Sequence, residues 1–364
     1  MPILWRYILR SFFQVFLLCV CTFIGVLLVM RFQEIARFAA SGAPIVKVLF
    51  FMLLQVPYIL PLAIPVSALI ASLLLFQKLS HLHELTALRS SGLGLKPIIA
   101  PLLFAGVLLS AINFVITCEL SPLSRGLTKS LIYEMAATNP LFLLQKESLL
   151  KLKHVFIDMK VLKTGHYADN VVLALKNTST DRLALVSAQK LYLNGSFLKG
   201  DNVVIISSVD SKKEDGFDHL VIENQEEMNT PASNFTQFAP HADWESSYEY
   251  LPLRWIRANE RLERGSWHLG RSALLEISKR ISLSLAAFTF TLIGVAFGTD
   301  ISRTRSKKRI FWAIILAALY LVCFLMAKSF RHTPTISMAI LLLIHPLIIL
   351  LSLKSLRTIA RGIE

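Results

Sequence analysis

The stretch VLFFMLLQVPYILPLAIPVSALIASLLLF, residues 48–76, contains no charged side chain and is long enough to cross a lipid bilayer as a helix. Three prolines interrupt it, Pro57, Pro61 and Pro65, and each removes one backbone N–H from the helical hydrogen-bond ladder. We therefore expect a kinked or tilted spanning helix whose freed carbonyl groups are satisfied by neighbouring helices. The stretch predicts a membrane protein.

Five further apolar runs in the chain approach the length that a bilayer core requires. They are Phe12–Met30, Pro97–Thr117, Ile281–Thr299, Ile310–Ala327 and Ile336–Leu353. The first of them is longer than the apolar core of a cleaved signal peptide, so we expect it to be retained as a spanning helix. The sequence therefore predicts six spans, three within residues 1–138 and three within residues 271–364.

The net positive charge of the chain comes from these membrane regions. The 364 residues include 38 Lys and Arg against 24 Asp and Glu, a net charge of +14, while residues 118–280 contain 20 of each kind. A nucleic-acid-binding protein would concentrate its excess on a polar domain, so no nucleic-acid partner is expected. With the N-terminus in the cytoplasm, short loops inside the cell hold 13 basic residues and those outside hold 5. The charge bias predicts that both termini are cytoplasmic and that the central block is not.

The central block, residues 139–270, has the pattern of a β-rich domain. Short runs rich in β-branched residues are separated by turn signals of Gly, Asn and Asp. The runs are His154–Val161, Asn170–Leu175, Arg182–Val186, Lys190–Leu193, Asn202–Ser207 and His219–Glu223. This spacing predicts an inserted all-β domain of sandwich or jelly-roll-like form. The Trp and Arg residues of Pro252–Arg271 are typical of a segment at the headgroup boundary.

Sequence signatures of catalysis are absent. The chain contains no G-x-x-x-x-G-K-[ST] phosphate loop, no H-E-x-x-H zinc motif and no G-x-S-x-G nucleophile turn. Its four cysteines, Cys19, Cys21, Cys118 and Cys323, lie in or beside apolar runs without metal-ligand spacing. We therefore expect no catalytic residue, metal or cofactor, and any ATP hydrolysis would belong to another chain.

The segment QKLSHLHELTALRSSGLGLK, residues 77–96, joins the second and third spans. Its leucines Leu79, Leu82, Leu85 and Leu88 recur at every third position and would form one apolar helix face, with Glu84 pointing away from it. Residues 90–92, Ser-Ser-Gly, predict the end of the helix. Periodicity alone favours a short amphipathic helix at the interface with a solvated glutamate.

Residues 84–92, ELTALRSSG, resemble the E-(L/I)-x-x-(M/L)-x-(A/S)-x-G segment of the LptF/LptG (YjgP/YjgQ) permeases. The layout of three spans, a β-rich domain and three spans is similar to that family, as is Asn139-Pro140 before the domain. The resemblance covers essentially the whole chain. It implies a permease subunit of the ABC transporter that extracts lipopolysaccharide from the bacterial inner membrane and passes it to a periplasmic β-protein bridge.

The resemblance also implies partners. These are a cytoplasmic ATPase dimer, a second six-span permease chain that completes a heterodimer, and single-span and soluble periplasmic β-jelly-roll export proteins. In the family the segment corresponding to residues 77–92 docks into a groove of the ATPase, with its glutamate in the contact. Carried over to this chain, the ATPase-coupling residues are Glu84, Leu85, Leu88, Arg89 and Gly92. Whether the chain is the F-like or the G-like partner stays open.

Basic residues near the outer ends of the first spans have two interpretations. Arg31 and Arg37 flank Glu34 at spacings of three, so Glu34 can bridge them, and Lys47 precedes the second span. The residues alone indicate ordinary interfacial anchoring. The resemblance implies contact with the lipid phosphates, carried over to Arg31, Arg37 and Lys47 and, less directly, to Arg125.

Two further alternatives remain open from the sequence. The basic run of residues 303–309, RTRSKKR, is typical of a topology signal, and ATPase docking or anionic-lipid binding is its alternative role. For the whole chain, the alternatives are a permease of another envelope-lipid or lipoprotein exporter and a non-transporting envelope scaffold or membrane enzyme. Lipoprotein exporters carry their large external domain after the first span, whereas here it follows the third.

Overall fold

A computed structural model describes most of the chain. The described residues are 2–40, 43–138, 149–152, 155–163, 167–176, 183–194, 197–209, 219–231, 248–264, 270–299, 307–330 and 333–360. They form two compact units. The first contains Met1–Met30, Leu54–Arg125 and Tyr248–Glu364, and the second contains Arg31–Leu53 and Gly126–Ser247.

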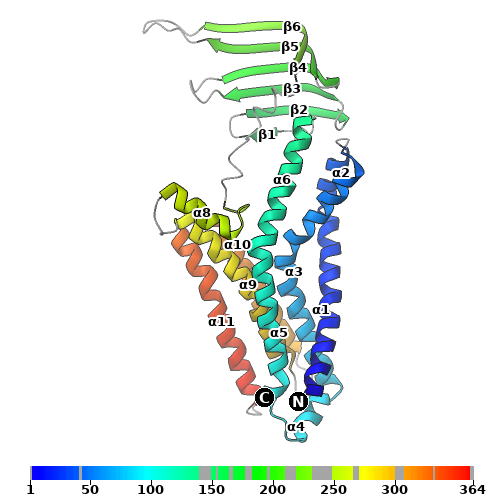
Figure 1. Ribbon diagram of the computed structural model, residues 1–364, viewed down its shortest axis with the longest axis vertical. Coiled ribbons are helices and arrows are strands. Elements are labelled where there is room, and N and C mark those ends of the chain that lie inside the picture. The colour runs from blue at the N-terminus through cyan, green and yellow to red at the C-terminus, as the bar shows by residue number, and fades with distance from the viewer. Residues whose placement is uncertain are drawn as a thin grey trace. The chain divides into compact units, whose positions relative to one another are not determined.

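Six helices are long and apolar enough to cross a membrane, which confirms the six predicted spans. In chain order the helical elements are α1 (Pro2–Met30), α2 (Phe32–Ala40), α3 (Ile45–His81), α4 (Glu84–Ser90), α5 (Leu95–Val115), the π-turn η1 (Ile116–Leu120), α6 (Ser121–Thr138), α8 (Leu253–Arg264), α9 (Arg271–Gly298), α10 (Lys307–Ser329) and α11 (Pro334–Ala360) (Figure 1). The third span is longer than predicted, because the helix runs through η1 into α6.

Helix α9 is the most buried of the spans and packs through small residues. Gly106 of α5 faces Thr291, and a Cβ at Gly106 would lie 3.1 Å from the Thr291 Cβ. On another side of α9, Gly294 meets Ser72 and the Leu69 carbonyl of α3, and a Cβ at Gly298 would lie 3.0 Å from the Leu73 carbonyl oxygen. Because of these small residues, α9 packs closely against both α3 and α5.

The proline-rich helix α3 stays continuous, and a neighbouring side chain binds one of its freed carbonyls. Pro65 has no N–H, so the carbonyl of Pro61, four residues earlier, lacks its helical donor. The buried Asn113 Nδ2 of α5 donates to Pro61 O at 3.3 Å and to Leu283 O of α9 at 3.0 Å. The expected satisfaction of a freed carbonyl by an adjacent span is confirmed at this position.

Six strands form one antiparallel sheet in the second unit. They are β1 (Leu149–Leu152), β2 (Val155–Lys163), β3 (Tyr167–Lys176), β4 (Leu183–Asn194), β5 (Phe197–Val209) and β6 (His219–Pro231). Each strand pairs with its neighbour in sequence, as the ordered arrows of Figure 1 show. A buried row, Val171–Ala188–Val203, crosses the three central strands, with Leu191 buried beside it.

The predicted fold class is confirmed: six apolar helices with an antiparallel β-sheet between the third and fourth. Two details of the strand prediction are wrong. The predicted runs Arg182–Val186 and Lys190–Leu193 are not separate strands: from Leu183 on they belong to the single strand β4, because no turn residue lies between them and residues 187 and 188 pair with both neighbouring strands. Strand β1 was not predicted. The described strands make a single meander, so a jelly-roll form of the domain stays a prediction.

Candidate functional site

The segment between the second and third spans folds as a break followed by a short helix. Helix α3 ends at His81, and His83 adopts a left-handed conformation with φ 55° before α4 begins at Glu84. The prediction of one continuous leucine face is therefore wrong, since Leu82 lies in the turn and is 55% exposed. Leu79 and Leu85 are buried in the same core as Ile8 of α1 and Ile98 of α5.

Helix α4 ends at Ser90, within the Ser-Ser-Gly segment where the sequence predicted its end. Gly92 has φ +86°, its N–H donates to Arg89 O at 3.0 Å, and the Leu93 N–H donates to Leu88 O at 3.2 Å. This pair of bonds is a Schellman motif, in which a residue with positive φ satisfies the last helical carbonyls. Glycine tolerates this conformation without a Cβ penalty.

Glu84 is half-buried and is held by a residue that the sequence did not indicate. The Tyr7 hydroxyl, on the first helix, donates to Glu84 Oε2 at 3.0 Å and lies 3.3 Å from Oε1. Of the other proposed coupling residues, Leu85 is fully buried, Leu88 packs against the same core, and Arg89 is half-buried. α4 is thus seated by its leucines on the helical bundle, with Glu84 and Arg89 partly accessible.

The basic residues proposed as lipid-phosphate contacts lie in both units. Arg31 donates to Glu34 at 2.8 Å, as the spacing predicted, and Lys47 donates to Glu134 at 2.8 Å. The side chain of Arg37 lies outside the described structure. Arg125 belongs to the other unit, where its guanidinium carbon is 4.4 Å from the ring centroid of Tyr58 and its buried Nε has no hydrogen-bond partner among the described atoms.

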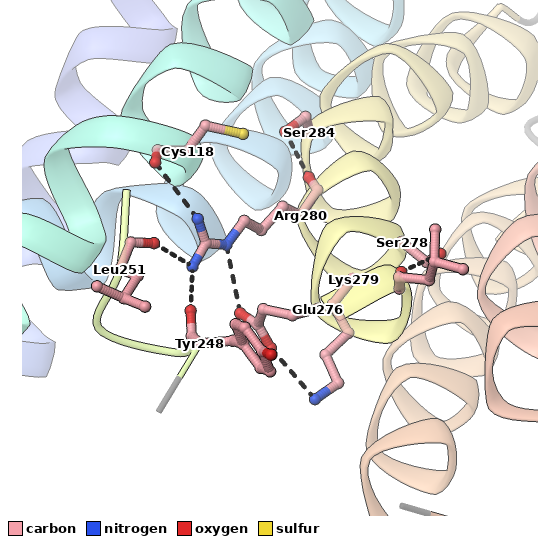
Figure 2. Close-up of polar contacts among 9 residues, drawn as sticks. Cys118, Tyr248, Leu251, Glu276, Ser278, Lys279, Arg280 and Ser284 are labelled. Carbon is pink, nitrogen blue, oxygen red and sulfur yellow. Dashed lines mark hydrogen bonds and ion pairs between the residues drawn. The ribbon is translucent and has the colours of Figure 1, made fainter. Parts of the chain in front are cut away.

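A second polar site surrounds Arg280 near the start of α9, and Figure 2 shows its contacts. The Arg280 side chain is only 4% exposed. Its Nη2 donates to Tyr248 O at 2.7 Å and Leu251 O at 2.9 Å, and its Nη1 lies 3.4 Å from Cys118 O of η1. Its Nε bonds Glu276 at 3.3 Å, and Glu276 also pairs with Lys279 at 3.5 Å. Four acceptors therefore compensate a buried cation.

The Arg280 site had only a weak signal in the sequence. Arg280 directly precedes the apolar run that starts at Ile281, where an arginine is typically an interfacial anchor. Three of its acceptors are backbone carbonyls, which any residue type would supply. Several other features of the sequence lie outside the described residues, namely Asn139-Pro140, Trp267 and residues 303–306. Across the described ranges, no group of three His, Cys, Asp or Glu side chains is arranged to hold a metal ion.

These features define a class: a polytopic membrane protein with six spans and a β-sheet inserted after the third. The family model for the lipopolysaccharide export system permease LptF/LptG matches residues 6–357. The chain therefore belongs to the LptF/LptG family of inner-membrane lipopolysaccharide export permeases, as the resemblance of residues 84–92 predicted. A sequence search of curated proteins finds no match.

Proposed function

We propose that the chain is one permease subunit of an ABC transporter that extracts lipopolysaccharide from the inner membrane. The near-complete family match carries this proposal. A second six-span chain would complete the lipid cavity, and a separate cytoplasmic ATPase dimer would supply the energy. Both termini are proposed to face the cytoplasm, which places α4 on the ATPase side and residues 139–270 in the periplasm.

Helix α4 is the proposed site of ATPase docking. Glu84 and Arg89 are the partly accessible charged residues on it, and Leu85 and Leu88 anchor it to the bundle. Because Leu85 shares a core with α1, α3 and α5, a displacement of α4 by the ATPase would pass directly into three spans. Gly92 ends the helix and sets the direction in which the chain enters the third span.

The proposed lipid-phosphate contacts are Arg31, Arg37, Lys47 and Arg125. Guanidinium groups suit bidentate binding of phosphate. Arg31 and Lys47 each hold a carboxylate, which a lipid phosphate would replace, whereas the Arg125 Nε is a donor without an acceptor among the described residues. Past the membrane, the buried apolar row Val171–Ala188–Val203 supports a role of the β-domain in shielding acyl chains. Its edges would pair with the next β-protein of the bridge by strand addition.

Purification in mild detergent tests this proposal. The wild-type chain should co-purify with an ATPase subunit and a second six-span chain, and Glu84→Ala should lower recovery of the ATPase only. Thr86→Ala is the matched control, because Thr86 is an exposed residue of the same helix and should leave recovery unchanged. If the wild-type chain brings down neither partner, the transporter proposal is wrong and a scaffold role is favoured.

A further inference from the structure

The chain that returns from the β-sheet meets spans three and four at one side chain. It re-enters the helical unit at Tyr248, and the carbonyls of Tyr248 and of Cys118, which lies within span three, both bond Arg280. Leu251, in the turn that follows, adds a third carbonyl (Figure 2). We use the name neck for the residues where the returning chain lies against span three: Cys118, Glu119, Tyr248, Leu251 and Arg254.

Arg280 joins the two segments of this neck. Within the described part of the chain, the two neck segments are also joined by the ion pair of Arg254 and Glu119 at 3.5 Å. Its side chains are 87% and 37% exposed, and such exposed pairs contribute little. The Arg280 guanidinium is buried and has directional N–H groups aimed at both segments, so removing it takes a charged donor away from the carbonyls of Cys118 and Tyr248. A lysine at this position would keep the charge, but its ammonium group lacks the planar set of N–H donors with which a guanidinium binds several acceptors at once.

The Cys118 carbonyl, which accepts from Arg280, lies in the π-turn η1. Such turns contain one residue more than the α-helical repeat and occur frequently at functional sites. Conversion of η1 to regular α-helix would rotate Cys118 O with respect to α9. The Arg280–Cys118 contact therefore depends on the π conformation of η1.

We propose that Arg280 is a positioning residue for lipid transfer: it clamps the neck by fastening the returning chain at Tyr248 and Leu251 to spans three and four. Its effect on lipid transfer rests on the proposed function, whereas the clamp itself does not rest on docking of α4. The clamp acts through backbone carbonyls.

Cross-linking in the full-length chain tests the clamp. Glu119→Cys and Arg254→Cys place two thiols where the exposed ion pair now lies, in a background with the four native cysteines replaced by Ala. Cys118→Ala is compatible with the clamp because only the backbone carbonyl is used. The initial rate of bridging by a short bifunctional thiol reagent should fall about tenfold with Arg280→Gln, since hydrogen bonds to charged groups hold the neck closed.

The matched control is Lys279→Gln. Lys279 is the neighbouring cation on α9 and pairs with Glu276. It should leave the bridging rate unchanged. Arg280→Lys, which keeps the charge and loses the fork, should give an intermediate rate and serves as the test variant if Arg280→Gln does not fold. Equal rates for the wild type and a folded Arg280 variant would overturn the clamp.

A second measurement separates positioning from general stability. In vesicles containing the assembled exporter, Arg280→Lys should lower the amount of lipid delivered per ATP hydrolysed. A purely structural role would reduce delivery and hydrolysis together and leave their ratio at the wild-type value, which would contradict the positioning role. Failure of the wild-type exporter to assemble would count against the proposed function, while the bridging rates would still decide the clamp.

Discussion

Tyr7 and Glu84 are 77 positions apart in the chain, yet the tyrosine hydroxyl donates to the carboxylate at 3.0 Å. The bond joins the first spanning helix to α4. The neighbouring Leu85 is fully buried, so the backbone of α4 is fixed at this point and the hydroxyl selects the direction of the Glu84 side chain. The residue proposed to meet the ATPase is therefore already oriented by a partner within the chain.

The first prediction concerns this hydrogen bond. Tyr7→Phe keeps the aromatic ring and removes the donor, so Glu84 should lose its preferred orientation and ATPase recovery should fall about three- to tenfold in quantitative pull-down. Tyr192→Phe is the matched control, because Tyr192 also has a carboxylate partner, Asp201, in the β-sheet. Unchanged or higher recovery with Tyr7→Phe would mean that the hydroxyl does not prepare Glu84 for docking.

Much of this fold could be predicted from local pattern. Hydropathy predicts the six spans because a bilayer-spanning helix needs a long apolar run, whatever its tertiary partners. The end of α4 at Gly92 was predictable for a similar reason, since the left-handed residue that ends a helix is usually glycine. Alternation located strands β2 to β6, but it divided β4 where Ser187, Ala188 and Gln189 weaken the apolar signal.

The remaining contacts depend on tertiary structure. Tyr7 is one of several aromatic residues in its span, and no spacing connects it with Glu84. The acceptors of Arg280 are mostly backbone carbonyls, which leave no signature in the sequence. The break at His83 was also missed, because the leucine spacing continues through it at a helical period. In each case the local sequence pattern is compatible with more than one three-dimensional arrangement, so it could not predict the contact.

The second prediction concerns the glycine that ends α4. The Cβ added by Gly92→Ala would have no neighbouring atom within 4 Å. The substitution should therefore lower the unfolding free energy only through the strain of an alanine at positive φ, by about 1 kcal/mol. Gly94→Ala is the control, because Gly94 has φ −64° and should be nearly neutral. Denaturant unfolding in detergent measures both. Equal unfolding free energies for the two variants would contradict a conformational role for Gly92.

The third prediction tests the close packing of α9 on α3. Gly294→Ala places its Cβ against the Ser72 hydroxyl and the Leu69 carbonyl, so the helices must move apart and stability should fall by about 1–3 kcal/mol. Gly25→Ala, also in a spanning helix, has no atom within 4 Å of its new Cβ. Its melting temperature should match the wild type or rise slightly. A Gly294→Ala protein as stable as Gly25→Ala would show that this interface is not tightly packed.

The fourth prediction concerns Asn113 and the carbonyl freed by Pro65. Asn113→Leu removes the donor to Pro61 O and should destabilise the chain by about 0.5–2 kcal/mol, the range measured for hydrogen bonds in membranes. Pro65→Ala restores the N–H that faces Pro61 O within α3, so it should reduce the cost of Asn113→Leu. The loss should not vanish, because Asn113 also donates to Leu283 O.

A double-mutant cycle measures this coupling. Unfolding in detergent of the wild type, both single variants and the double variant should give a combined loss smaller than the sum of the single losses. Pro57→Ala is the control, because it restores an N–H facing Leu53 rather than Pro61 and should add independently to Asn113→Leu. Additive losses for Pro65→Ala and Asn113→Leu would mean that water or another group, and not Asn113, satisfies the freed carbonyl.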